Sequence, residues 1–159
     1  MAKFKFGVIL NEDTMTTARL GDSTTPATNL LNDADVGKFV KLVGDSQYGL
    51  CAVGNEIEGI MNSVNTATQD GYAIGGVQEE GRVSVTLDGL QATPGTGVIA
   101  IGDYVVAGTV VARNTALGGA DPKVCKATAA GSALNFKWRV VSLKGTTAVG
   151  QTALIEFVG

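Results

Sequence analysis

The feature that most constrains the fold of this chain is a short alternating segment framed by glycines. Residues Gly81–Gly89 read GRVSVTLDG, so apolar and polar side chains alternate through the whole segment. Successive side chains of a β-strand point to opposite faces, which places Val83, Val85 and Leu87 together on one apolar face. The pattern therefore predicts a strand with one face in a hydrophobic core.

A similar segment recurs near the C-terminus, where Gly150–Phe157 reads GQTALIEF. Each of the two segments follows a Gly-x-aromatic-Val motif, at Gly37–Val40 and at Gly102–Val105, then a cysteine-bearing segment and a segment rich in Val, Ile or Met. This shared order predicts a degenerate two-fold repeat over residues 36–89 and 102–159. The alternative is chance similarity, because alternation is common in small β domains.

Short β-rich segments separated by glycine turns fill most of the chain after residue 36. Such spacing is typical of an all-β barrel or sandwich. We therefore predict an all-β fold, either a small antiparallel β-barrel or a sandwich, with a jelly-roll arrangement as one form of the latter. The expected strands are 39–43, 49–53, 57–64, 72–77, 82–87, 98–101, 104–106, 109–113, 123–127, 136–143 and 152–158.

The first 35 residues differ in composition from the rest of the chain. After an alternating start, residues 11–35 are rich in Thr, Asn, Asp and Ser, and a polar stretch of this length is often functional or flexible. We predict an N-terminal strand and extended arm over residues 1–35 and a β domain over residues 36–159, which should stay folded without the arm. A long surface loop is the alternative. The partner-binding residues expected on the arm are Phe4, Phe6, Val8, Leu10, Met15 and Leu20.

Composition narrows the classes of function. Only 17% of the residues are charged and 45% are hydrophobic, and no apolar run reaches the length of a membrane helix. A protein so poor in charge often covers part of its surface with other protein. The net charge of −3 argues against nucleic acid as a partner. The N-terminus lacks a signal-peptide pattern, so we expect synthesis in a cytoplasm.

The sequence offers little chemistry for catalysis or metal binding. It contains no histidine, the commonest general base and metal ligand. The carboxylate pairs Glu56/Glu58 and Asp33/Asp35 fit acid–base work on spacing alone, but solvated strand faces and loops carry such pairs more often. The segment from Asn32 resembles only the beginning of a calcium loop. We expect no enzyme activity, no catalytic residues, no metal and no cofactor.

The two cysteines, Cys51 and Cys125, lie in apolar, strand-like segments. Buried free thiols are the favoured state, because an intracellular chain of this size folds without a disulfide. A disulfide between them is the alternative, and it requires that the two halves of the predicted repeat face each other.

The order of these segments resembles the capsid cement, or head decoration, proteins of tailed bacteriophages. The resemblance is carried by GKFV at 37–40, GLCAV at 49–53, GRVSVTLDG at 81–89, the segment from Gly97 to Val105 and GTV at 108–110. It covers residues 36–159 and leaves the first 35 residues without a counterpart. The connection between Val111 and Phe136 is also longer than in the family pattern.

The resemblance implies a mechanical role. A cement subunit binds the outside of the phage head and bridges major capsid proteins against internal pressure. The implied partners are the major capsid protein and further copies of the chain, as a homodimer or homotrimer, with no nucleic acid and no membrane. The implied location is the virion surface, after synthesis in the bacterial cytoplasm. The alternative is a tail or head-fibre adhesin module that binds host glycans.

Overall fold

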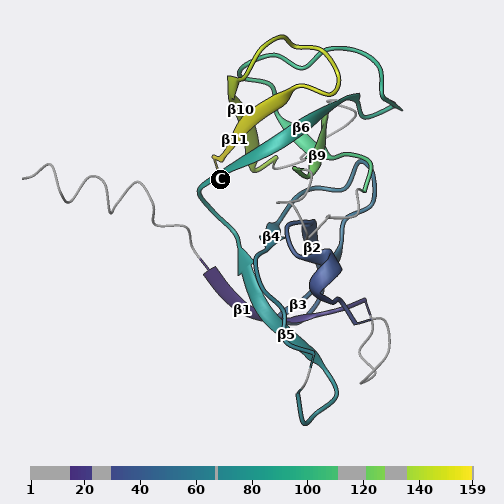
Figure 1. Ribbon diagram of the computed structural model, residues 1–159, viewed down its shortest axis with the longest axis vertical. Helices are drawn as coiled ribbons and strands as arrows, with labels where there is room; N and C mark the ends of the chain where they lie inside the picture. The colour runs from purple at the N-terminus through teal and green to yellow at the C-terminus, as the bar shows by residue number, and fades with distance from the viewer. Residues whose placement is uncertain (1–14, 23–29, 67, 111–120, 128–135, 159) are drawn as a thin grey trace, which may run out of the picture.

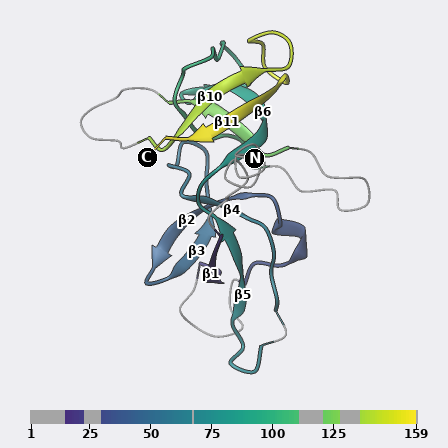
Figure 2. The ribbon, with the colours of Figure 1, turned by 90° about the vertical axis from the view of Figure 1, so that its left-hand side faces the viewer.

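The computed structural model describes residues 15–22, 30–66, 68–110, 121–127 and 136–158. Its strands form two units, which lie one above the other in Figures 1 and 2. The first unit holds β1 to β5 and the second holds β6 to β11. The predicted all-β fold with a small barrel is confirmed.

The first unit is a closed barrel in which the strands follow the order β1-β3-β2-β4-β5. A single turn of 3-10 helix, η1 at Asp33–Asp35, precedes β2. The strand bounds are β1 Met15–Leu20, β2 Phe39–Gly44, β3 Gln47–Leu50, β4 Gly59–Met61 and β5 Ala73–Gln78.

The second unit, called here the second sheet, follows the order β10-β11-β6-β9-β8, with β7 paired to β6. Its two outer strands also meet, because Tyr104, just before β8, forms an isolated antiparallel bridge with Arg139 of β10. The strand bounds are β6 Arg82–Leu90, β7 Thr93–Pro94, β8 Val105–Ala107, β9 Lys123–Lys126, β10 Trp138–Leu143 and β11 Thr152–Phe157.

The two units have the same topology. In the first, β1 pairs in parallel with β3, and the pairs β3–β2, β2–β4, β4–β5 and β5–β1 are antiparallel. In the second, β6, β8, β9, β10 and β11 take the places of β1 to β5 with the same directions, and the Tyr104–Arg139 bridge stands for the β2–β4 pair. The chain is therefore a tandem duplication of one five-stranded arrangement.

The equivalence extends to single residues at the start of β2 and β8. Gly37 and Gly102 have φ angles of 87° and 92°, in the left-handed region that favours glycine. Gly37 N donates to Met61 O at 2.6 Å, and Gly102 N donates to Val140 O at 2.8 Å. The two Gly-x-aromatic-Val motifs thus occupy equivalent positions, which makes Phe39 the counterpart of Tyr104.

The limits of the two units differ from the predicted repeat of 36–89 and 102–159. The first described unit runs from β1 to the end of β5 at Gln78, and the second begins with β6 at Arg82. The segments 81–89 and 150–157 are neighbouring antiparallel strands of one sheet, β6 and β11. They are not equivalent, because β6 opens the second unit and corresponds to β1.

Each unit has its own buried cluster of hydrophobic residues. In the second sheet, Val85 and Leu87 are fully buried and Val83 packs against the same cluster, which confirms the predicted core face of that strand. The first barrel is filled by Ala18, Leu20, Leu31, Val40, Tyr48, Met61, Ala73 and Val77.

The predicted boundary at residue 36 passes through the first barrel. Strand β1 pairs with β5 over six residues and with β3 over two, so Met15–Leu20 belongs to the barrel. A chain that starts at residue 36 therefore lacks a wall strand of this barrel. The physical reason is visible in β1, where Ala18 and Leu20 are 4% and 1% exposed and complete the interior.

We predict that Leu20→Ala lowers the free energy of unfolding by about 2–5 kcal/mol, because it leaves a cavity in the first barrel. Met15→Ala is the matched control, since Met15 lies in the same strand but is 50% exposed. Urea denaturation of both variants measures the effect. Equal losses for the two variants would contradict the assignment of β1 to the barrel wall.

Candidate interaction surfaces

In each candidate carboxylate pair, one member makes structural contacts, whereas the buried Oε1 of Glu56 has no hydrogen-bond partner among the described residues. Asp35 is buried and caps η1, because Asn32 N donates to its Oδ2 at 3.0 Å. Lys38 Nζ lies 2.7 Å from the other carboxylate oxygen of Asp35. Glu58 accepts a hydrogen bond from Leu42 N and lies 3.7 Å from Lys137 Nζ. Among the described residues, no group of three His, Cys, Asp or Glu side chains is placed to hold a metal ion.

The cysteines are free and buried, at separate sites. Burial raises the pKa of the Cys51 thiol to about 12. Burial, followed by the nearby Asp88 carboxylate, raises the pKa of the Cys125 thiol to about 11. A nucleophilic or metal-binding cysteine needs the opposite shift, toward the thiolate. Both thiols therefore act as small core side chains.

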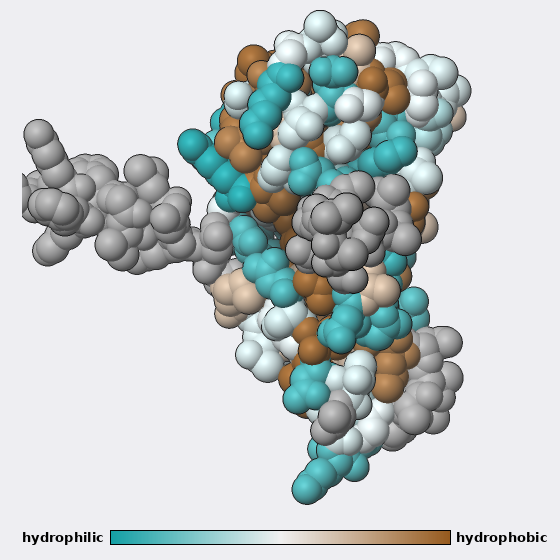
Figure 3. Space-filling view, viewed as in Figure 1, coloured by the Kyte–Doolittle hydropathy of each residue, from teal (hydrophilic) through white to brown (hydrophobic). Residues whose placement is uncertain are grey.

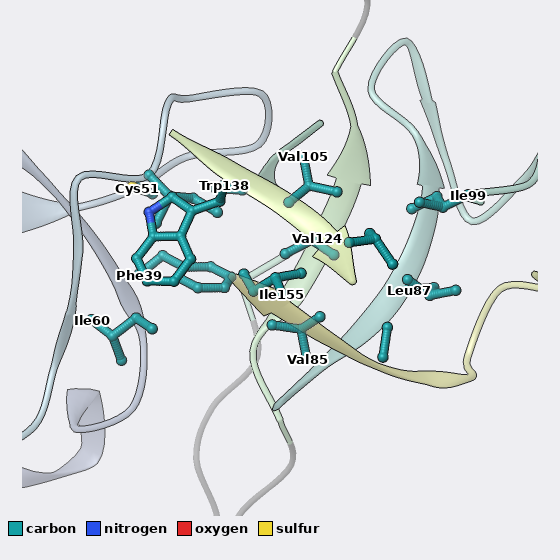
Figure 4. Packing of buried hydrophobic residues seen from close by; sticks show 14 residues of the cluster. Phe39, Cys51, Ile60, Val85, Leu87, Ile99, Val105, Val124, Trp138 and Ile155 are labelled. Atoms are coloured by element: carbon teal, nitrogen blue, oxygen red, sulfur yellow. The ribbon is translucent and has the colours of Figure 1, made fainter. Parts of the chain in front are cut away.

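The outer surface of the first barrel contacts the second sheet through hydrophobic side chains. Four of its side chains point out of the barrel and join the hydrophobic core of the second sheet in one cluster. Figure 4 shows Phe39 and Cys51 beside the Trp138 ring, with Ile155 and Val85 below. We name this surface the covered wall, and it consists of Phe39, Cys51, Ile57 and Ile60.

Backbone hydrogen bonds extend the same contact. Gly54 N donates to Ala107 O at 2.8 Å, and Ala107 N donates to Asn55 O at 2.9 Å. A loop of the first barrel therefore pairs with the edge of β8 as a neighbouring strand would. Together with the Glu58–Lys137 ion pair, these bonds fix the orientation of the two units.

A pocket opens beside this contact and is lined by both units, including Phe39, Cys51 and Val110. Its two cationic residues already face carboxylates, since Lys38 pairs with Asp35 at 2.7 Å and Lys123 Nζ lies 3.7 Å from Asp88. The pocket thus lacks the converging polar groups that orient a bound small molecule.

The counterpart of the covered wall on the second sheet is not buried. Tyr104 takes the place of Phe39, and Phe136 lies two residues before β10 as Ile57 lies two before β4. The Tyr104 and Phe136 rings are 6.2 Å apart, and Tyr104 is 44% exposed, whereas Phe39 is 6% exposed. We name this surface the open wall, and it consists of Tyr104, Ala127, Phe136 and Arg139.

Other large hydrophobic side chains are exposed singly or in pairs. Leu42 and Val43, at the end of β2, are 49% and 41% exposed, and Val98 and Ile101 lie in the loop before β8 at 59% and 64%. In the face shown in Figure 3, hydrophobic residues reach the surface around the waist between the units. Isolated exposure is normal, but aromatic pairs at a surface are enriched at interfaces.

The residues predicted for partner binding are only partly described. Phe4, Phe6, Val8 and Leu10 lie outside the described residues. Of the other two, Met15 is 50% exposed, whereas Leu20 is 1% exposed inside the first barrel and cannot contact a partner. The open wall was not predicted from the sequence, although the second Gly-x-aromatic-Val motif, at Gly102–Val105, marks its position.

Comparisons of the chain with protein-family models, curated proteins and solved structures found no match. Among the described residues, no helix has the length and hydrophobicity needed to cross a membrane.

We predict that Phe39→Ala lowers the free energy of unfolding by about 3–5 kcal/mol, because it removes an aromatic ring from the core shared by the two units. Tyr104→Ala is the matched control at the equivalent position, where exposure should limit the loss to about 1 kcal/mol or less. Urea denaturation, followed by tryptophan fluorescence of Trp138, measures both. A larger loss for Tyr104→Ala would contradict the contrast between the two walls.

We also predict that stability falls as pH rises above about 8.5, the ordinary pKa of a thiol in an unfolded chain. The folded thiols titrate at about 12 and about 11, so the unfolded state releases these protons first. The buried thiols contribute their full stabilisation below about pH 8.5. This stabilisation falls progressively as the pH rises from there toward the folded pKa values. Urea denaturation at about pH 7 and about pH 10 measures the loss, which should be smaller in Cys51→Ala/Cys125→Ala. Equal losses would show that the thiols do not contribute.

Proposed function

We propose that this protein is a capsid cement subunit, which binds the outer surface of a bacteriophage head and bridges major capsid proteins. The proposal rests on the motif resemblance and on what the fold adds to it. The observation that carries it is the union of two barrel-like units through one hydrophobic core, with an aromatic wall left open on the surface.

The segments that resemble cement proteins lie at the centre of this architecture. GKFV at 37–40 supplies Phe39 of the covered wall, and GLCAV at 49–53 supplies Cys51. The segment at 81–89 forms most of β6, the strand between β11 and β9. The segment from Gly97 to Val105 carries Tyr104 of the open wall. The segments that carry the resemblance thus include residues of the contact between the two units and a residue of the open wall.

The physical properties of the chain fit a mechanical role. A cement protein needs a stiff body and an adhesive surface rather than a reactive group. Burial of the covered wall stiffens the chain, and the exposed apolar residues offer contacts for other proteins. Each contact is of modest size, but many copies on one shell add their contributions.

Co-sedimentation with capsids of the same virus that lack this subunit tests the proposal. We expect saturable binding at a stoichiometry commensurate with icosahedral symmetry, and a higher temperature of capsid disruption. Capsids that already carry the subunit are the control, because their sites are filled. Failure of the folded, monodisperse protein to bind bare capsids would contradict the cement role.

A further inference from the structure

The covered wall and the open wall are equivalent surfaces with different environments. In the first unit the wall is buried by the second unit of the same chain, whereas in the second unit the wall is at the surface. We infer that the open wall binds the first barrel of a second copy of this chain, so that copies associate head to tail.

The hydrogen bonds of the two walls support the comparison. Cys51 N donates to Phe39 O at 3.0 Å in the covered wall, and Ala127 N donates to Tyr104 O at 2.9 Å in the open wall. Arg139 takes the place of Ile60, because each pairs with the last strand of its unit, at Glu156 and Gln78 respectively. The open wall thus has the same backbone hydrogen bonding as the covered wall, but its side chains are more polar. Such a composition suits an interface that forms between folded proteins.

Charge identifies the first barrel as the occupant. Residues 15–81 contain nine acidic and three basic side chains, whereas residues 82–159 contain four acidic and seven basic ones. At the open wall, Lys126 is already paired with Asp103 at 2.9 Å, so the positive charge there comes from Arg139. Opposite charges favour contact of the second sheet with a first barrel, and like charges oppose contact of two open walls.

The tip of the β2–β3 hairpin is the surface of the first barrel that fits. Leu42 and Val43 expose 49% and 41% of their surface there, and Asp45 lies in the turn that follows. Asp22 also lies near Val43, because a Cβ atom added to Gly49 would contact both the Asp22 Oδ1 atom and a Val43 methyl group. An apolar pair flanked by two carboxylates complements an aromatic pair that lies beside Arg139.

The two surfaces are different patches of the chain, so each copy can use both at once. Contacts of this kind are heterologous and produce a ring if the rotation closes, or a filament if it does not. The inference concerns the protein alone and does not depend on the capsid proposal.

Sedimentation velocity of the purified full chain over a concentration series tests the inference. We expect the wild type to form oligomers, and Tyr104→Ser/Phe136→Ser and Leu42→Ser/Val43→Ser each to weaken association about tenfold or more. In a mixture of the two, the first variant still has an intact hairpin tip and the second still has an intact open wall. The mixture should therefore form dimers and nothing larger.

Met15→Ser is the control, because it removes an exposed apolar side chain at the other end of β1 from Arg19, whose N donates to Ser46 O in the hairpin turn, and it should assemble as the wild type does. Circular dichroism melting shows whether each variant is folded, and Tyr104→Ser alone replaces the double variant if that one misfolds. A wild type that stays monomeric at every concentration would overturn the inference and leave the open wall to another partner. A folded mixture that stays monomeric would overturn the head-to-tail arrangement.

Discussion

The structure depends on the burial of the covered wall in the core of the second sheet. Residues such as Phe39 face outward from their own barrel, yet they belong to the same hydrophobic cluster as Val85 and Ile155. The second sheet uses this contribution to fill its core, because Phe39 and Cys51 pack beside Trp138 of β10 (Figure 4). Removal of either unit would expose a large apolar surface, so the two units should unfold together.

The two units can pack against each other because equivalent positions in them carry different side chains. Ile60 and Arg139 occupy equivalent positions in the two units. The residues just before them, Gly59 and Trp138, are therefore equivalent as well. A side chain at Gly59 would meet a Val77 methyl group at 2.4 Å, whereas Trp138 fills the end of the second sheet and packs edge-on against Phe157 at 5.7 Å. These differences fit one unit to contribute its outer wall and the other to bury it in its core.

Local patterns predicted the strands well and their partners poorly. Alternation in β6 was sufficient to assign Val85 and Leu87 to a core, because side-chain direction follows from the period of a strand. The parallel pairs β1–β3 and β6–β9 join distant segments, and nothing local specifies them. Strand β1 was misassigned to an arm for the same reason. The apolar segment 98–101 is a loop whose Ile99 is buried by tertiary contacts.

The candidate surface was hidden for a related reason. Phe39 and Tyr104 occur in the same motif, and the motif determines only that each side chain points out of its unit. Whether such a residue is buried depends on what packs outside, which is a property of the whole chain. Among the described residues, one wall is buried by the other unit, and its counterpart keeps Tyr104 at the surface. The same motif thus supplies a core residue in one unit and a surface residue in the other.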